Sequence, residues 1–297
     1  MMERGRYVVG LGEALWDMLP EGKQLGGAPA NFAYHAGQFL GMENVIAVSA
    51  LGEDELARET EDAFAARSLP SYMPRVPYPT GTVQVTLDDR GIPSYEIREG
   101  VAWDHIPFDP RIIQLASHCI AVCFGSLAQR NDLSRRTIQS FLSHTPKDCL
   151  RIFDINLRQH YYSSEVVETS LRSADILKIN DEELLIVAKM FGHEGNDAEG
   201  ICRALMADYT LRNVVLTCGT DGSYVFTQRE SLFRPTPHVV VADTVGAGDS
   251  FTGAFCAALL RGLSAAEAHQ LAVEVSAFVC TQHGAMPKLT DELRARL

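Results

Sequence analysis

Short apolar runs alternate with helix-like segments along nearly the whole chain, and this alternation limits the folds that it can adopt. The runs lie at residues 7–9, 44–49, 119–124, 150–155, 175–179, 214–217 and 239–241. They are apolar nearly throughout, which is typical of parallel strands covered on both faces. Helical spacing of apolar residues occurs at residues 30–40, 54–66, 133–143, 181–190, 198–207, 248–261 and 265–283. We therefore predict a doubly wound α/β fold that spans residues 1–297 as one domain.

Two segments break this alternation. Residues 80–87 and 92–98 alternate polar and apolar side chains around the sequence DDRG at 88–91, which is a hairpin-turn signal. Residues 15–24 resemble a second short ribbon, with a turn at the sequence PEG. We interpret both as a small antiparallel sheet that stands off the main domain, made of about residues 13–25 and 71–103. The alternative is a hairpin at the edge of the main sheet.

Charge and cysteine usage exclude several classes of protein. The formal net charge of -12 argues against nucleic acid or an anionic membrane as the main partner. No apolar run approaches the ~18 residues of a membrane span, and the first six residues do not form an apolar signal region. The seven cysteines are scattered without a C-x-x-C pair, and the nine histidines do not cluster at metal spacing. We expect a reduced, cytoplasmic enzyme.

The sequence DTVGAGDSF at residues 243–251 carries the strongest chemical signal. Gly246 and Gly248 allow the backbone to approach a ligand closely, and the predicted helix start supplies N–H groups for an anion. Asp249, in the first turn, would repel phosphate unless it holds a hydroxyl group toward the phosphorus. We expect the helix N-terminus to keep Asp249 ionised, and therefore a weak base. The alternative is that Asp249 only satisfies the start of the helix.

Other nucleotide motifs fail on inspection. Asp17 stands where a P-loop ending at Gly22 and Lys23 needs glycine. Leu15 and Phe251 occupy the third glycine position of the two candidate dinucleotide fingerprints. A dehydrogenase is therefore disfavoured.

Five short motifs together resemble the ribokinase-like (pfkB) carbohydrate kinases. DTVGAGD at 243–249 resembles the second signature of that family, and GGAPAN at 26–31 resembles the first. DINLR, NDEE and TCGTDG follow the family's order at 154–158, 180–183 and 217–222. The resemblance covers nearly the whole chain, although Ile155 stands where relatives often carry proline. It implies a three-layer α/β/α ribokinase-like (Rossmann-like) domain with a small antiparallel β-sheet lid, and phosphoryl transfer from ATP.

The resemblance also implies roles for individual residues. Asp249 would be the catalytic base, beside an anion hole made by the amides of Gly246, Ala247 and Gly248. The acceptor sugar would be held by Asp17, Gly27, Asn31 and Arg158. The nucleotide would contact Thr217, Gly219, Gly222, Asn180 and, near the adenine, Gly284. Magnesium would be placed, through water, by Asn180 and Glu183, and a monovalent cation such as K+ by Asp243 and Val245.

Each role has a structural alternative. Asn31 would merely cap a helix, Asp17 would be a turn carboxylate, and Arg158 would pair with Asp154. The residues 180–183 would be a solvated first helical turn, and 217–222 only a turn between strands.

Within the family, the sequence most resembles fructokinases at residues 13–17, 31–35 and 125–128. This implies transfer to the 6-hydroxyl group of fructose and a homodimer formed through the lid. Ribose, 2-keto-3-deoxygluconate, a nucleoside or a sugar phosphate are alternative acceptors. A sugar phosphate would call for extra cations near the lid, for which Arg75, Arg90 and Arg98 are available. A sugar-sensing protein without catalysis is the alternative from another class.

Overall fold

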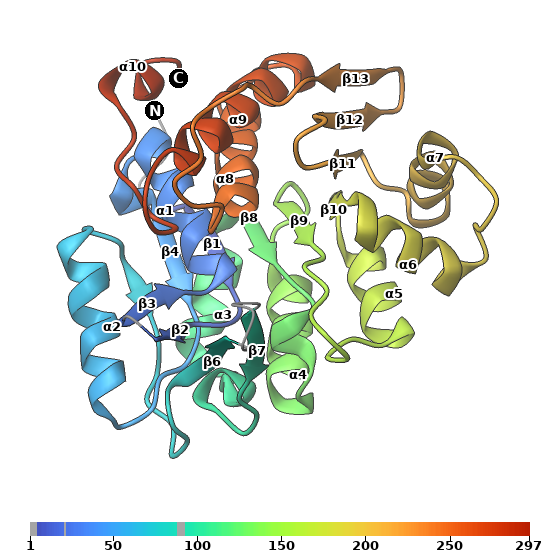
Figure 1. The fold of residues 1–297 in the computed structure, drawn as a ribbon. Coiled ribbons are helices and arrows are strands. Elements are labelled where there is room, and N and C mark those ends of the chain that lie inside the picture. The colour runs from blue at the N-terminus through green and yellow to red at the C-terminus, as the bar shows by residue number, and fades with distance from the viewer. Residues whose placement is uncertain (1–4, 21, 88–92) are drawn as a thin grey trace.

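The computed structural model of the chain describes residues 5–20, 22–87 and 93–297. Its main sheet has nine strands in the order β13-β12-β11-β10-β9-β8-β1-β4-β5 (Figure 1). Seven of them are parallel: β1 (Tyr7–Leu11), β4 (Val45–Val48), β5 (Ser71–Tyr72), β8 (Cys119–Phe124), β9 (Leu150–Asp154), β10 (Ile176–Asn180) and β11 (Asn213–Thr217). The strands β12 (Ser223–Thr227) and β13 (Ser231–Arg234) extend the sheet antiparallel at one edge.

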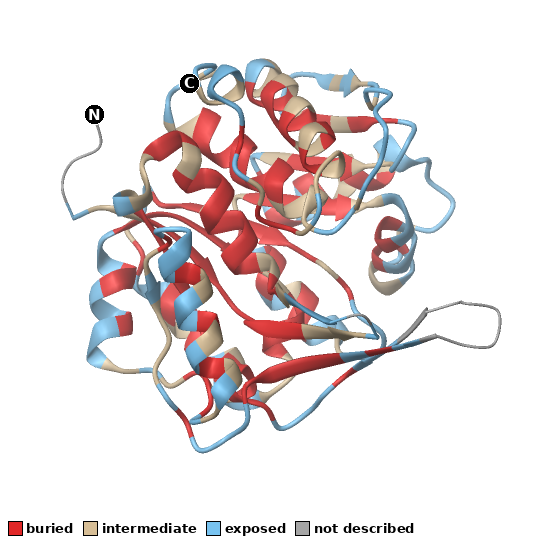
Figure 2. Ribbon diagram, turned by 60° about the vertical axis from the view of Figure 1, so that its left-hand side comes forward, coloured by how far each residue is buried: buried red, intermediate tan, exposed pale blue. Residues whose placement is uncertain are grey.

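Helices cover both faces of this sheet. One layer contains α1 (Ala28–Leu40), α8 (Ala247–Leu260) and α9 (Ala265–Cys280), and α2 (Glu55–Ala66) adds Phe64 to the same core. The other layer contains α3 (Pro110–Ser117), α4 (Asp132–His144), α5 (Ser164–Ser173), α6 (Asp181–Phe191) and α7 (Ala198–Tyr209). A short α10 (Asp291–Arg294) follows near the C-terminus. Buried residues fill the sheet and the helix faces that contact it, which gives three layers (Figure 2).

Six of the seven strands predicted for the main sheet are confirmed within one or two residues, and the seventh is wrong. Residues 239–241 form no strand and lie in the connection between β13 and α8. Their β-branched side chains suggested a strand, but no neighbouring strand pairs with them, and Val240 is 89% exposed. The strands β5, β12 and β13 were not predicted: β5 has only two residues, the apolar run of β12 is limited to residues 224–226, and β13 is a partly exposed edge strand.

The predicted lid is a separate four-stranded sheet and not an edge hairpin. Its order is β3-β2-β6-β7, with bounds β2 (Leu15–Leu19), β3 (Gly22–Gly26), β6 (Gly81–Leu87) and β7 (Pro93–Ile97). The pairs β2–β3 and β6–β7 are antiparallel, and a parallel β2–β6 pair joins the two hairpins. The predicted turn at 88–91 and Glu21 of the other turn lie outside the described residues.

Side chains of the main domain hold one edge of the lid. Gln159 Nε2 donates to the carbonyl oxygen of Tyr95 at 2.7 Å, and the Tyr161 hydroxyl donates to that of Ile97 at 3.1 Å. Both carbonyls belong to the edge strand β7, whose backbone would otherwise need water or another strand. The lid is therefore fixed to the segment that follows β9. Among the described residues, no helix has the length and apolar character needed to cross a membrane.

Candidate active site

Two clefts meet at the carboxyl ends of the parallel strands, where open α/β sheets usually bind ligands. One has a volume of about 690 Å³ and lies between the loop after β11, the start of α8 and the C-terminal half of α9. The other has a volume of about 610 Å³ and lies between the lid, α1 and α8. Asn180, Thr244 and Gly248 line both clefts, so a group held in one can reach the other at this point.

The start of α8 has the geometry expected of an anion site. Gly246 is the residue before the helix and has φ of 78°, in the left-handed region. A side chain there would place its Cβ atom 2.7 Å from the backbone of Ala285, so only glycine fits. The next N–H groups, those of Gly248 and Asp249, have no partner within the helix. The loop therefore presents backbone donors where the two clefts meet.

Asp249 stands beside these donors and is held by a side chain from α1. Asn31 Nδ2 donates to Asp249 Oδ2 at 2.7 Å, although the two residues are 218 positions apart. Desolvation raises the pKa of Asp249 to about 6, and the nearby Asp154 carboxylate adds to this effect. The expectation that Asp249 is a weak base is therefore wrong, because desolvation raises its pKa, although the expectation that it is ionised at neutral pH agrees with this value. A carboxylate with this pKa is ionised at neutral pH and is a stronger base than an ordinary aspartate.

A buried ion pair that the sequence analysis missed lies beneath the glycine loop. Lys178 Nζ in β10 is 3.0 Å from Asp154 Oδ1 at the end of β9, and the Thr252 hydroxyl donates to Asp154 Oδ2 at 3.0 Å. A Cβ atom on Gly248 would lie 2.9 Å from Lys178 Nζ, so the cation sits directly behind the anion site. The available signal was a lysine inside an otherwise apolar strand.

Arg158 contacts the acceptor cleft and does not pair with Asp154. The Asp154 carboxylate is occupied by Lys178 and Thr252, which excludes the alternative proposed from the sequence. Arg158 Nη1 donates to the carbonyl oxygen of Leu157 at 3.2 Å, and Arg158 lines the cleft on the lid side.

The other residues expected to hold the sugar also line this cleft, and they come from two elements. Asp17 lies in β2 and pairs in register with Gln24, so it is not a turn carboxylate. Gly27 is the N-cap of α1, and Asn31 lies one turn further and bonds Asp249 rather than capping the helix. The cleft is rich in acids: its charged lining residues are Glu13, Asp17, Glu183, Asp249, Arg158 and Lys178. Glu13 was not predicted as a site residue.

Asn180 and Glu183 form a reciprocal helix cap rather than a solvated turn. Asn180 Oδ1 accepts from the Glu183 N–H at 2.8 Å, and Glu183 Oε2 accepts from the Asn180 N–H at 3.0 Å. Glu183 Oε1 accepts from the Leu157 N–H at 2.8 Å, and burial raises the pKa of Glu183. Both carboxylate oxygens are thus already engaged, and no cluster of three acidic, His or Cys ligands occurs among the described residues. Asn180 and Glu183 could therefore contact a metal ion only through bridging water molecules.

The larger cleft contains the expected nucleotide loop. Thr217, Gly219 and Gly222 line it, together with Val239 and Val241 from the connection that was predicted as a strand. Gly222 has φ of 142°, and a Cβ atom there would lie 2.4 Å from the carbonyl oxygen of Arg234. The loop therefore lines the larger cleft and also forms the turn between β11 and β12.

The acidic side chain of Asp243 connects the glycine loop to the C-terminal tail. Its Oδ1 accepts from the Val245 N–H at 3.0 Å and its Oδ2 accepts from the Gly284 N–H at 3.0 Å. Gly284 is placed against Asp243 and is not among the residues that line the nucleotide cleft. The contact closes the loop without needing a cation.

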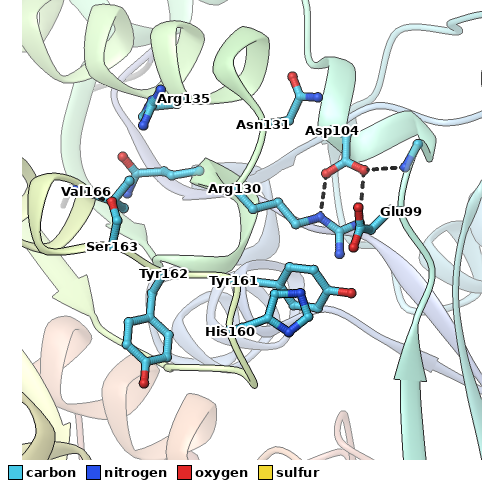
Figure 3. A pocket seen from close by; sticks show the side chains of 12 residues that line it. Glu99, Asp104, Arg130, Asn131, Arg135, His160, Tyr161, Tyr162, Ser163 and Val166 are labelled. Atoms are coloured by element: carbon cyan, nitrogen blue, oxygen red, sulfur yellow. Dashed lines mark hydrogen bonds and ion pairs between the residues drawn. The ribbon is translucent and has the colours of Figure 1, made fainter.

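A further cavity of about 430 Å³ lies at the root of the lid, away from Asp249 (Figure 3). Its main cation, Arg130, pairs with Asp104 at 2.7 Å and lies 3.9 Å from the ring of Trp103 and 4.6 Å from that of Tyr161. Asp104 also accepts from the N–H groups of Gly100 and Val101. Because these charges neutralise one another, we attribute to this cluster the structural role of holding the lid.

Comparison with known proteins places these features in a family. Residues 20–292 match the pfkB family carbohydrate kinase. An ATP-dependent 6-phosphofructokinase of Thermoanaerobacterium thermosaccharolyticum is 26% identical over 276 residues, which cover 91% of this chain and 83% of that protein. A fructokinase of Vibrio alginolyticus is 27% identical, with 95% and 96% covered. A fructokinase from Vibrio cholerae O395, solved with fructose, ADP and a calcium ion, superposes with a TM-score of 0.80 and 25% identity, covering 99% of this chain and all of that one.

Proposed function

Because the chain belongs to the pfkB family of carbohydrate kinases, we propose that it transfers the γ-phosphate of ATP to the 6-hydroxyl group of fructose, with Asp249 as the catalytic base. Family membership makes it a sugar kinase, a phosphotransferase whose acceptor is an alcohol group. The acceptor and the residue roles are our proposal. The observation that carries it is the position of Asp249, held by Asn31 at the point where the two clefts meet.

The proposed reaction is an in-line displacement at phosphorus. ATP occupies the cleft lined by Thr217, Gly219 and Gly222, with its γ-phosphate at the N–H groups of Gly248 and Asp249, since the predicted donor Ala247 already donates to the carbonyl oxygen of Thr244 at 3.3 Å. The sugar oxygen forms a bond to phosphorus while the bond to the β,γ-bridging oxygen breaks, which releases ADP. The hydroxyl proton passes to the Asp249 carboxylate. A magnesium ion on the ATP phosphates, reached by Asn180 and Glu183 through water, would neutralise their charge.

The charge of the acceptor cleft favours a neutral sugar. Four of its six acidic or basic lining residues are acids, and Lys178 is already paired with Asp154. Arg158 is the remaining cation, whereas a sugar phosphate normally needs more than one. Arg75 is committed elsewhere, to Glu61 at 2.6 Å and to the carbonyl oxygen of Gly52, and Arg90 lies outside the described residues. The relative that acts on fructose 6-phosphate keeps that sugar phosphate as the second candidate acceptor.

The lid is proposed to close over the sugar and to exclude water, which limits hydrolysis of ATP. The predicted bounds of 13–25 and 71–103 are too wide, because residues 71–72 form β5 of the main sheet, and the lid sheet itself is made of β2, β3, β6 and β7. We propose that this lid belongs to a single kinase domain of residues 1–297. We propose that two chains associate through the lid. Gln159 and Tyr161 already donate to carbonyl oxygens of the edge strand β7, so the two chains would pair through the opposite edge strand, β3. The monovalent cation at Asp243 and Val245 and the adenine contact of Gly284 stay predictions.

The proposed base sets the pH dependence of the reaction. Asp249 must be ionised to accept a proton, and its pKa is raised to about 6. We expect kcat/KM for the sugar to fall about tenfold per pH unit below this value, rather than below the value near ~4 of an ordinary aspartate. Initial rates at saturating ATP, measured from about pH 5 to about pH 8, give the pH below which kcat/KM begins to fall. A kcat/KM that stays constant down to about pH 5 would contradict the assignment, because an ordinary aspartate is still ionised there.

A panel of acceptors tests the proposed substrate. We expect ATP- and magnesium-dependent release of ADP with fructose, and kcat/KM at least ~10-fold higher for fructose than for fructose 6-phosphate, because the cleft is acidic. Ribose, 2-keto-3-deoxygluconate and a nucleoside complete the panel. A preference for fructose 6-phosphate or another acceptor would retain the kinase and overturn the fructokinase assignment. Sugar binding without turnover of any acceptor would favour the sugar-sensing alternative.

A further inference from the structure

One buried acid beside the proposed reaction site has no role in the mechanism above. Glu13 lies in the connection between β1 and β2, at the carboxyl end of β1, and is 4% exposed. Its Oε1 accepts from the N–H group of Ala28 at 3.3 Å, while its Oε2 is buried and has no hydrogen-bond partner among the residues that the structure describes. A buried carboxylate with so little hydrogen bonding is costly, whereas the neutral acid is tolerated.

The contact with Ala28 fixes the start of α1. Ala28 is the first residue of this helix, and its N-cap, Gly27, has no side chain to accept from the free N–H groups. Glu13 supplies the missing acceptor from a different part of the chain. The two segments also touch through the backbone, because a Cβ atom on Gly27 would lie 2.5 Å from the carbonyl oxygen of Glu13.

The same helix orients the proposed base. Asn31 lies in the first turn of α1, directly above the segment that Glu13 caps, and donates to Asp249 Oδ2 at 2.7 Å. Asn31 Oδ1 has no partner, so the bond to Asp249 is the contact that defines the orientation of this amide. A shift of the start of α1 would therefore move the atom that holds the base.

We propose that Glu13 is a positioning residue of the phosphoryl-transfer site: as a neutral acid it holds the first turn of α1, and through Asn31 it orients Asp249. The proposal rests on the kinase activity and on Asp249 as the base, but not on the identity of the sugar.

The electrostatic surroundings agree with this role. Burial raises the pKa of Glu13 to about 7, and Asp249 on α8 adds to this effect. Hydrogen bonding to the backbone of Glu13 and of Ala28 and the charge of Arg158, from the loop after β9, oppose the shift. Asp17 on the lid strand β2, Lys178 on β10 and Glu183 on α6 are the other charged groups that line the cleft. Above about pH 7, an ionised Glu13 would place a second negative charge beside Asp249 and the incoming phosphate. We therefore expect the rate to decline there.

Two substitutions distinguish the effect of the hydrogen bond to Ala28 from the effect of the charge on Glu13. Glu13→Gln keeps an oxygen that accepts from Ala28 and removes the titration, so we expect wild-type kcat near pH 6 without the decline above about pH 7. Glu13→Ala removes the acceptor as well, and we expect kcat to fall about tenfold at every pH, the effect of losing one helix cap. Glu53→Gln, at an exposed position, is the matched control and should reproduce the wild-type profile. An unchanged kcat in Glu13→Ala, or a decline in Glu13→Gln equal to that of the wild type, would overturn the proposal.

Thermal unfolding gives a second readout that needs no sugar. The pKa of Glu13 is raised on folding, so the wild type loses stability as the pH rises from that of an unfolded glutamate toward about 7. Glu13→Gln lacks this loss. We expect its Tm to exceed that of the wild type at about pH 8 and to match it near pH 4. If the Tm difference is the same at both pH values, Glu13 is not a buried neutral acid and the proposal fails, whatever the acceptor is.

Discussion

Substitution of Asp249 by asparagine is expected to lower kcat by at least ~10²-fold while the protein stays folded. The amide cannot accept the hydroxyl proton, yet it has nearly the same shape and can still accept the hydrogen bond from Asn31. Steady-state kinetics at about pH 7, with ATP and sugar each saturating, measure the effect.

The stability of this variant distinguishes a lost base from a damaged fold. Because the pKa of Asp249 is raised on folding, the ionised form costs stability once the pH rises through about 6. The Tm of Asp249→Asn should therefore equal or exceed that of the wild type at neutral pH. Asp62→Asn, in an exposed position on α2, serves as the matched control. A kcat for Asp249→Asn within ~10-fold of the wild type would contradict the role as base.

The second large effect is expected on stability. Replacing Lys178 with methionine leaves the Asp154 carboxylate buried without its partner cation, since the pair is 3.0 Å apart with side chains 13% and 7% exposed. Breaking a buried ion pair from one side costs about 3–5 kcal/mol of unfolding free energy. Urea denaturation with linear extrapolation measures it. Loss of the cation should also move the acid limb of kcat/KM above about pH 6, because Lys178 lowers the pKa of Asp249.

A second substitution tests whether the unpaired charge of Asp154 causes this loss of stability. Adding Asp154→Asn to Lys178→Met removes the unpaired charge and keeps an acceptor for Thr252, so we expect it to restore part of the lost stability. Lys147→Met, at an exposed position, should change the unfolding free energy by less than ~0.5 kcal/mol. An unfolding free energy for Lys178→Met within ~1 kcal/mol of the wild type would contradict the expected loss of stability.

The sequence predicted those parts of the fold whose signal is local. Six central strands were found because each is a continuous apolar run, as β8 shows with every residue buried. The strand β13 was missed because this edge strand keeps exposed positions that dilute the apolar pattern, and β12 was missed because its apolar run is only three residues long. Residues 239–241 were misread because valines that line a ligand cleft have the same composition as a buried strand.

The candidate site was predictable where its residues form a motif and not where they meet only through the fold. The glycine loop and Asp249 lie within seven positions of one another, so they can be recognised together as one sequence motif. Lys178 pairs with an acid 24 positions away, and Glu13 caps a helix that starts 15 positions later. Such contacts depend on strand order and loop path. The pKa of Asp249 was misjudged for the same reason, since it is set by desolvation that the chain creates only when folded.

Phosphorus NMR of the reaction products tests the central claim most directly. The protein is incubated with ATP, magnesium and fructose, and the phosphorus signals are assigned against authentic sugar phosphates. We predict stoichiometric formation of ADP and fructose 6-phosphate, and neither product with Asp249→Asn over the same time. Inorganic phosphate in place of a sugar phosphate, or a sugar phosphate formed equally by the Asp249→Asn variant, would contradict the account.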